Sequence, residues 1–252
     1  MNKEISPHAG QFSHQYDVRP FAPIISRVID FLPHLAHRVT YIDEESLQKI
    51  KEGGAILIAA PHTSHVDALI TLYMLRDISL HIALLAGADY WDPAKRPFVP
   101  ELMHKFNLIP VAREAGVPEG MKVANWNDIG QILKEGWNVF LFPEGTRDEA
   151  HRFQFEGGVV ALSRRYKKPI IPIGLSGFQK ILPKGERVPR IGRSVVMNID
   201  RPIWEEDVPG WIDLALKERI PAFTDYLQKY MKVQICACIP LATHAFTISY
   251  RS

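Results

Sequence analysis

Residues 55–60 read Ala-Ile-Leu-Ile-Ala-Ala, follow two glycines and precede a proline. A compact apolar run without alternation is typical of a strand that is buried on both faces, as in a parallel sheet. Other apolar runs are also expected to be strands, and they are residues 80–85, 107–112, 138–142, 169–175 and 195–199 with Ile203.

The segments between these runs carry apolar residues at helical spacing. They are residues 44–52, 64–76, 121–135, 158–166 and 211–231, the last with a break expected near Pro221. Strands that alternate with helices predict an α/β fold, here a single domain with a mostly parallel mixed sheet flanked by helices.

An amphipathic helix is expected near the N-terminus, over residues 21–39, because Phe21, Ile24, Val28 and further apolar residues fall on one stripe. Pro33 is expected to kink or split this helix. Packing on the domain core is favoured, and an interfacial helix that lies on a bilayer is the alternative.

The domain organisation follows from the lack of internal repeats and low-complexity linkers in the sequence. We expect one domain over residues 20–232, preceded by a flexible arm at 1–19. Residues 233–252 are apolar and β-branched, and they fit either an added edge strand or a poorly ordered tail.

The bulk composition excludes some classes of partner. Of the 252 residues, 46% are hydrophobic and 23% are charged, and the net charge is +2, which are globular values. No basic stripe with interleaved aromatic residues is present, so no nucleic-acid partner is expected. Since no run of about 18 apolar residues occurs, any membrane contact should be peripheral.

A candidate catalytic pair lies in residues 61–67, which read Pro-His-Thr-Ser-His-Val-Asp. In a regular helix, positions 62 and 67 would differ by roughly 140° and face apart. If His62 instead precedes the helix and Asp67 lies in its first turn, the carboxylate can bond one imidazole nitrogen and make the other more basic. An imidazole so placed could remove a proton from an alcohol near neutral pH.

Two other interpretations of these residues stay open. Ser64 and Asp67 match a capping box, in which Asp67 only stabilises the start of the helix. A metal site formed by His62, His65 and Asp67 is a remote alternative, and no metal is predicted.

A second patch follows a buried strand and reads Phe-Pro-Glu-Gly-Thr-Arg over residues 142–147. Pro143 ends the strand, and Gly145 permits an unusual backbone angle. Glu144 and Arg147 are therefore expected at the carboxyl end of the sheet, where open α/β sheets bind ligands. Arg147 suits a bidentate contact with phosphate, although a simple Glu-Arg ion pair in a loop is an alternative.

With both patches in place, the chain resembles the glycerolipid acyltransferase family, whose best-known members are lysophosphatidate acyltransferases. The His-x4-Asp block of that family is matched by His62 and Asp67, and its Phe-Pro-Glu-Gly-Thr-Arg block by residues 142–147. Residues 109–113 resemble its second block, which ends in arginine, and residues 170–173 resemble its fourth.

Two positions depart from the family's pattern. Pro61 stands where an asparagine usually precedes the histidine, and residues 86–91 contain no lysine where many members carry one. The second departure leaves stabilisation of an oxyanion to backbone N–H groups.

The resemblance implies transfer of a fatty acyl group from an acyl-CoA or acyl carrier protein thioester to a hydroxyl of a lysophospholipid, with lysophosphatidate as the expected acceptor. It implies that His62 is the general base and that Asp67 orients it. No cofactor is implied, and no Gly-x-Ser-x-Gly elbow supplies a nucleophile. The residues implied to bind substrate are Arg113, Glu144, Gly145, Thr146 and Arg147.

A role in phospholipid biosynthesis, in the cytoplasm and peripherally on the inner face of the membrane, is the corresponding expectation. Three rival functions remain: acyl transfer to a non-glycerol acceptor, thioester hydrolysis, or lipid binding by a module with a degenerate site. The intact His62, Asp67, Glu144 and Arg147 argue against the degenerate site.

Overall fold

The computed structural model describes residues 36–64, 66–88, 107–112, 124–145, 153–183, 186, 190–236 and 246–250. An eight-stranded sheet forms the centre of the molecule, with strand order β4-β3-β5-β2-β6-β7-β1-β8. The strands are β1 (Ala36–Ile42), β2 (Ile56–Ala60), β3 (Ile82–Gly87), β4 (Leu108–Val111), β5 (Asn138–Leu141), β6 (Ile170–Ser176), β7 (Arg193–Ile199) and β8 (Phe246–Tyr250).

The strands from β4 to β6 in this order are all parallel, which places their carboxyl ends along one edge of the sheet. Strand β7 runs antiparallel to β6, β1 runs parallel to β7, and β8 closes the order antiparallel to β1. The expected mostly parallel mixed sheet is therefore confirmed, and the antiparallel pairs lie at β6–β7 and β1–β8.

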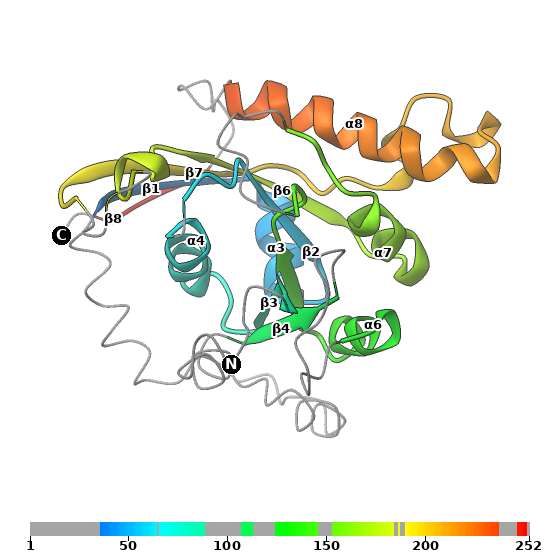
Figure 1. The fold of residues 1–252 in the computed structure, drawn as a ribbon, viewed down its shortest axis with the longest axis horizontal. Helices are drawn as coiled ribbons and strands as arrows, with labels where there is room; N and C mark the ends of the chain where they lie inside the picture. The colour runs from blue at the N-terminus through cyan, green and yellow to red at the C-terminus, as the bar shows by residue number, and fades with distance from the viewer. Residues whose placement is uncertain are drawn as a thin grey trace.

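Helices cover both faces of the sheet (Figure 1). One face carries α3 (Glu44–Glu52) and α4 (Asp67–Arg76), and the other carries α6 (Trp126–Lys134), α7 (Gly158–Tyr166) and α8 (Leu216–Cys236). None of these described helices is long and apolar enough to cross a membrane.

The apolar run at residues 55–60 corresponds to β2, the strand at the centre of the sheet that is buried on both faces. Its side chains alternate between two cores, with Leu57 and Ala59 among the α3–α4 side and Ile56, Ile58 and Ala60 among the α6–α8 side. All five residues of the strand are buried, because each face of the sheet is covered by helices.

The expected helix over residues 21–39 is wrong at its C-terminal end. Residues 36–39 belong to β1, which pairs with β7 over its whole length, and residues 21–35 lie outside the described part of the chain. The partner strand is more than 150 residues away in sequence, so the pairing overrides a local helical pattern.

Three other helices begin later than expected, one of them α6, which starts at Trp126 rather than at residue 121. Helix α4 starts at Asp67 rather than at residue 64, and α8 starts at Leu216 after a separate 3-10 turn at Trp211–Asp213. Helix α8 also continues across Pro221 to Cys236, and its buried face includes Phe223, Leu227 and Met231. The packing of that face offsets the loss of a backbone hydrogen bond at the proline.

Candidate active site

The two sequence patches meet because β2 and β5 are adjacent parallel strands. Their register pairs Ile58 with Leu141, so the residues that follow each strand leave the same edge of the sheet side by side. The backbone N–H of His62 donates a hydrogen bond to Glu144 Oε2 at 2.8 Å, across 82 residues of sequence. This bond joins the His-Asp patch directly to the Pro-Glu-Gly patch.

The imidazole of His62 lies beside the Asp67 carboxylate, as expected if His62 precedes the helix and Asp67 lies in its first turn. His62 lies in the turn before α4 and Asp67 is the first residue of that helix, with 3.3 Å between His62 Nδ1 and Asp67 Oδ2. A carboxylate at Nδ1 favours the tautomer that carries its proton on Nδ1 and leaves a lone pair on Nε2. The Nε2 atom is therefore the one that can accept a proton.

Asp67 also holds the turn that carries the histidine. Its Oδ2 atom accepts hydrogen bonds from the backbone N–H groups of Thr63 at 2.6 Å and Ser64 at 2.7 Å. The capping box with Ser64 as N-cap is not formed, because the N-cap residue is Val66 and it makes no side-chain cap. Asp67 thus contacts the ring and also holds the backbone that follows His62, while Glu144 holds the backbone N–H of His62 itself.

Phe142 sets the plane of the imidazole. The two rings are stacked, with their centroids 4.0 Å apart and an interplanar angle of 20°, and Phe140 contacts Phe142 edge-on at 5.3 Å. The side chain of His62 is 19% exposed, whereas that of Asp67 is fully buried. The ring is thus held between a buried acid and an aromatic face and still reaches solvent.

The corner after β5 is a tight turn in which Gly145 has a φ of +66°. Its N–H donates to the carbonyl of Phe142 at 3.1 Å, and the N–H of Glu156 donates to the carbonyl of Pro143 at 2.8 Å. A left-handed φ at position 145 favours glycine, as the sequence indicated. Because the Gly145 amide is engaged within the turn, it is not available to an oxyanion in this conformation.

Some of the predicted site residues lie outside the described part of the chain, namely Arg113, Thr146 and Arg147, and so does His65. Among the described ones, His62, Asp67, Glu144 and Gly145 come together at one edge of the sheet. The role of Phe142 was missed, and the only signal for it was its position directly after a strand parallel to β2.

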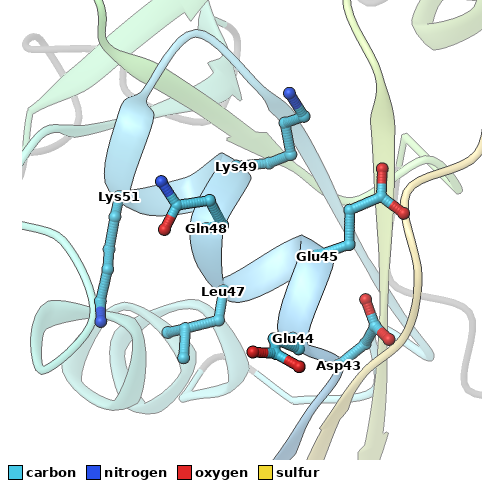
Figure 2. A pocket seen from close by; sticks show the side chains of 7 residues that line it. All are labelled: Asp43, Glu44, Glu45, Leu47, Gln48, Lys49 and Lys51. Carbon is cyan, nitrogen blue, oxygen red and sulfur yellow. The ribbon is translucent and has the colours of Figure 1, made fainter.

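A surface hollow of about 700 Å³ lies elsewhere, beside α3 (Figure 2). Its described lining comes from that helix and its N-cap Asp43, acidic at the Asp43–Glu45 end and basic at Lys49 and Lys51. Since neither His62, Asp67 nor Glu144 lines it, we place the active site by its chemistry at the β2–β5 edge.

Comparison with known proteins identifies the family. A model of the family described as Acyltransferase matches residues 38–176, which is more than half of the chain and includes both patches. The chain is 25% identical over 192 residues to the 1-acyl-sn-glycerol-3-phosphate acyltransferase of Bacillus subtilis (strain 168), covering 73% of this chain and 83% of that protein.

One further sequence relative and one solved structure of similar fold were also found. Over 56 residues, 22% of this chain and 16% of that protein, the chain is 39% identical to the chloroplastic 1-acyl-sn-glycerol-3-phosphate acyltransferase BAT2 of Brassica napus. The crystal structure of the 1-acyl-sn-glycerophosphate (LPA) acyltransferase PlsC from Thermotoga maritima has the same fold, with a TM-score of 0.56 at 16% identity over 85% of this chain and 76% of that one. The chain therefore belongs to the acyltransferase family and is an O-acyltransferase of the type that its motifs resemble.

Proposed function

We propose that this enzyme transfers a fatty acyl group from a coenzyme A or acyl carrier protein thioester to the free hydroxyl of lysophosphatidate. The observation that carries the proposal is the His62–Asp67 pair, buried on the acid side and open at the ring, beside the Glu144 corner. The acceptor is suggested by the Bacillus subtilis relative, whose name states that it acylates 1-acyl-sn-glycerol-3-phosphate.

In the proposed mechanism the acceptor hydroxyl attacks the thioester directly. His62 Nε2 takes the hydroxyl proton as the oxygen bonds to the carbonyl carbon, while Asp67 stabilises the imidazolium that forms. The tetrahedral intermediate then collapses, the carbon–sulfur bond breaks, and the imidazolium returns its proton to the departing thiolate. A thiolate is a good leaving group, so the enzyme needs neither a nucleophile of its own nor a metal or other cofactor.

The charges of the intermediate and the acceptor have separate proposed partners. Backbone amides of the corner beyond Gly145 stabilise the oxyanion, since the Gly145 amide itself is bonded to Phe142. Arg113 and Arg147 bind the phosphate of the acceptor through charge-assisted hydrogen bonds. Glu144 holds the His62 turn through its Oε2 atom and orients an arginine or the acceptor with its charge.

The test is turnover of an acyl thioester, measured as thiol release, with and without lysophosphatidate. The change His62→Ala should lower kcat about 10²–10⁴-fold because the general base is lost. His81→Ala removes a half-buried histidine at the start of β3 and serves as the matched control with unchanged kcat. A kcat of His62→Ala within threefold of the wild type would reject the mechanism, and equal thiol release without acceptor would favour a hydrolase.

Peripheral association with the inner face of the membrane is part of the same proposal. Its support is that the acceptor and the product of the proposed reaction are both membrane lipids. Co-sedimentation with vesicles that contain anionic lipid is the expected result, and it should weaken with salt as surface electrostatic attraction is screened. Failure to bind vesicles at any salt concentration would contradict this part.

A further inference from the structure

Of the two carboxylate oxygens of Asp67, only one forms hydrogen bonds with the described residues of the turn. The residue is fully buried, and its Oδ2 atom carries all of the hydrogen bonds described above. Its Oδ1 atom is buried and has no hydrogen-bond partner among the described residues. A carboxylate oxygen left without a partner in an apolar core is costly, so an interaction at Oδ1 is to be expected.

Thr71, on the same helix, has a buried hydroxyl oxygen that also lacks a hydrogen-bond partner among the described residues. Its side chain is fully buried, and its Oγ1 is the one buried hydroxyl oxygen without a hydrogen-bond partner in the described part of the chain. Residues 67 and 71 are the first and fifth residues of α4. Side chains four apart in a helix are neighbours, with Cβ atoms about 5–6 Å apart.

The other hydroxyls of the turn are already committed. Ser64 Oγ donates to the carbonyl of Leu182 at 3.1 Å and accepts from the N–H of Val66 at 3.4 Å. Thr63 Oγ1 lies 3.4 Å from Oδ2 rather than beside Oδ1. Among the described residues, Thr71 is thus left as the hydroxyl that can serve the second oxygen, in a core of apolar side chains such as Ile70 and Phe140.

We infer that Thr71 is a positioning residue that stabilises Asp67 by supplying a hydrogen bond to Oδ1, directly after a side-chain rotation or through one bridging water molecule. With Oδ1 held, Oδ2 stays directed at His62 Nδ1 and at the two backbone amides. Thr71 does not touch substrate in this role. The inference rests on the proposed function, because it assigns Thr71 to the His62–Asp67 pair.

Replacing Thr71 by valine tests this, since valine keeps the shape and removes the hydroxyl. In a folded Thr71→Val enzyme we expect kcat to fall about tenfold, with the KM of donor and acceptor within twofold of the wild type. Thr71→Ser should restore kcat to within threefold. Thr224→Val in α8, where the hydroxyl donates to the carbonyl of Ile220 at 2.8 Å, is the matched control with unchanged kcat.

A double-mutant cycle separates positioning from a general packing effect. In an Asp67→Asn background, Thr71→Val should lower kcat by less than twofold further, because the group it acts through has changed. A kcat of Thr71→Val within twofold of the wild type would overturn the inference, and so would a full tenfold loss in the Asp67→Asn background. If the valine variant does not fold, Thr71→Ala is judged by the same criteria.

The failure of this inference is distinguishable from failure of the proposed function. Loss of turnover in His62→Ala together with a fully active Thr71→Val would reject only the role of Thr71. Retained turnover in His62→Ala would instead reject the mechanism as a whole.

Discussion

At each end of the β2–β5 pair, a buried side chain hydrogen-bonds to the backbone beside β2, but the side chain is neutral at one end and acidic at the other. At the amino end, the side chain of Asn138 accepts from the N–H of Ala55 at 3.0 Å and donates to the carbonyl of Ile50 at 2.8 Å. At the carboxyl end, the side chain of Glu144 accepts from the N–H of His62 at 2.8 Å. Both side chains extend from β5 or its continuation to the backbone beside β2, and both are buried.

The difference lies in the charge. A neutral amide at position 138 satisfies backbone groups at moderate desolvation cost, whereas Glu144 and Asp67 place two carboxylates in a buried turn, which costs more. The amide oxygen of a glutamine at position 144 could accept the same bond from the His62 N–H. Buried charges where a neutral side chain would cost less are expected at functional sites, which supports the proposed site at the carboxyl end of the sheet.

The largest effect should follow from removing the charge of Asp67. Asp67→Asn keeps the size of the side chain, and its amide oxygen can still accept from the Thr63 and Ser64 amides. Without a carboxylate to stabilise the imidazolium, we expect kcat to fall about 10²–10⁴-fold in steady-state assays, with the fold retained in circular dichroism. A loss of less than tenfold would mean that the acid is structural, like Asn138.

Glu144→Gln tests the comparison directly, because it places the chemistry of Asn138 at position 144. Its amide oxygen can keep the bond to the His62 N–H, so the thermal midpoint should stay within a few degrees. We expect kcat/KM for the acceptor to fall about tenfold because the orienting charge is lost. A kcat/KM equal to that of the wild type would mean that Glu144 only holds the backbone, as Asn138 does. The two ends of the β2–β5 pair would then not differ in function.

Asn138→Ala should show the opposite pattern. It leaves the N–H of Ala55 and the carbonyl of Ile50 buried without partners, so we expect the free energy of unfolding to drop by about 3 kcal/mol in urea titrations. The kcat per folded molecule should stay within twofold. A large loss of kcat without loss of stability would place Asn138 in the active site and reject the division proposed here.

The smallest effect concerns His81, at the amino end beside the Trp137 ring, which it meets edge-on at 5.0 Å. Burial lowers the pKa of His81 below its ordinary value of 6.5, so the unfolded chain binds a proton at a higher pH than the folded one. Stability should therefore rise with pH from the lowered pKa up to about 6.5 and be constant above it.

The slope in that window cannot exceed about 1.4 kcal/mol per pH unit, and solvent around the half-buried ring reduces it further. Urea titrations of the wild type and of His81→Phe at pH 5 and pH 7.5 measure the contribution. An equal pH dependence in the two proteins would show that burial does not perturb this histidine.

The sequence predicted the parts of the fold that local patterns determine. Helices α3 and α7 have the expected bounds, and β2 differs by one residue, because caps, glycines and uninterrupted apolar runs act over a few neighbours. The local pattern at residues 36–39 predicts helix, whereas these residues form the start of β1, because β1 pairs with β7 in the other half of the chain. Local spacing contains no information on such a partner.

The site divides in the same way. The approach of His62 to Asp67 could be predicted, since five residues and a proline-led turn allow few geometries. The bond from the His62 backbone to Glu144 and the stacking of Phe142 depend on the β2–β5 register, which only the assembled sheet determines. The engagement of the Gly145 amide in its own turn could not be read from the residue type either.

Helix α4 is buried from Ile70 to Leu75, so it lies within the core, and its first residue is Asp67, the proposed partner of His62. A substitution that shifts this helix would therefore disturb the packing of the core and the position of the His62 imidazole at the same time. Attempts to engineer a new acceptor preference should therefore leave α4 intact and, in the corner after β5, should also keep Phe142 and Glu144, which contact His62.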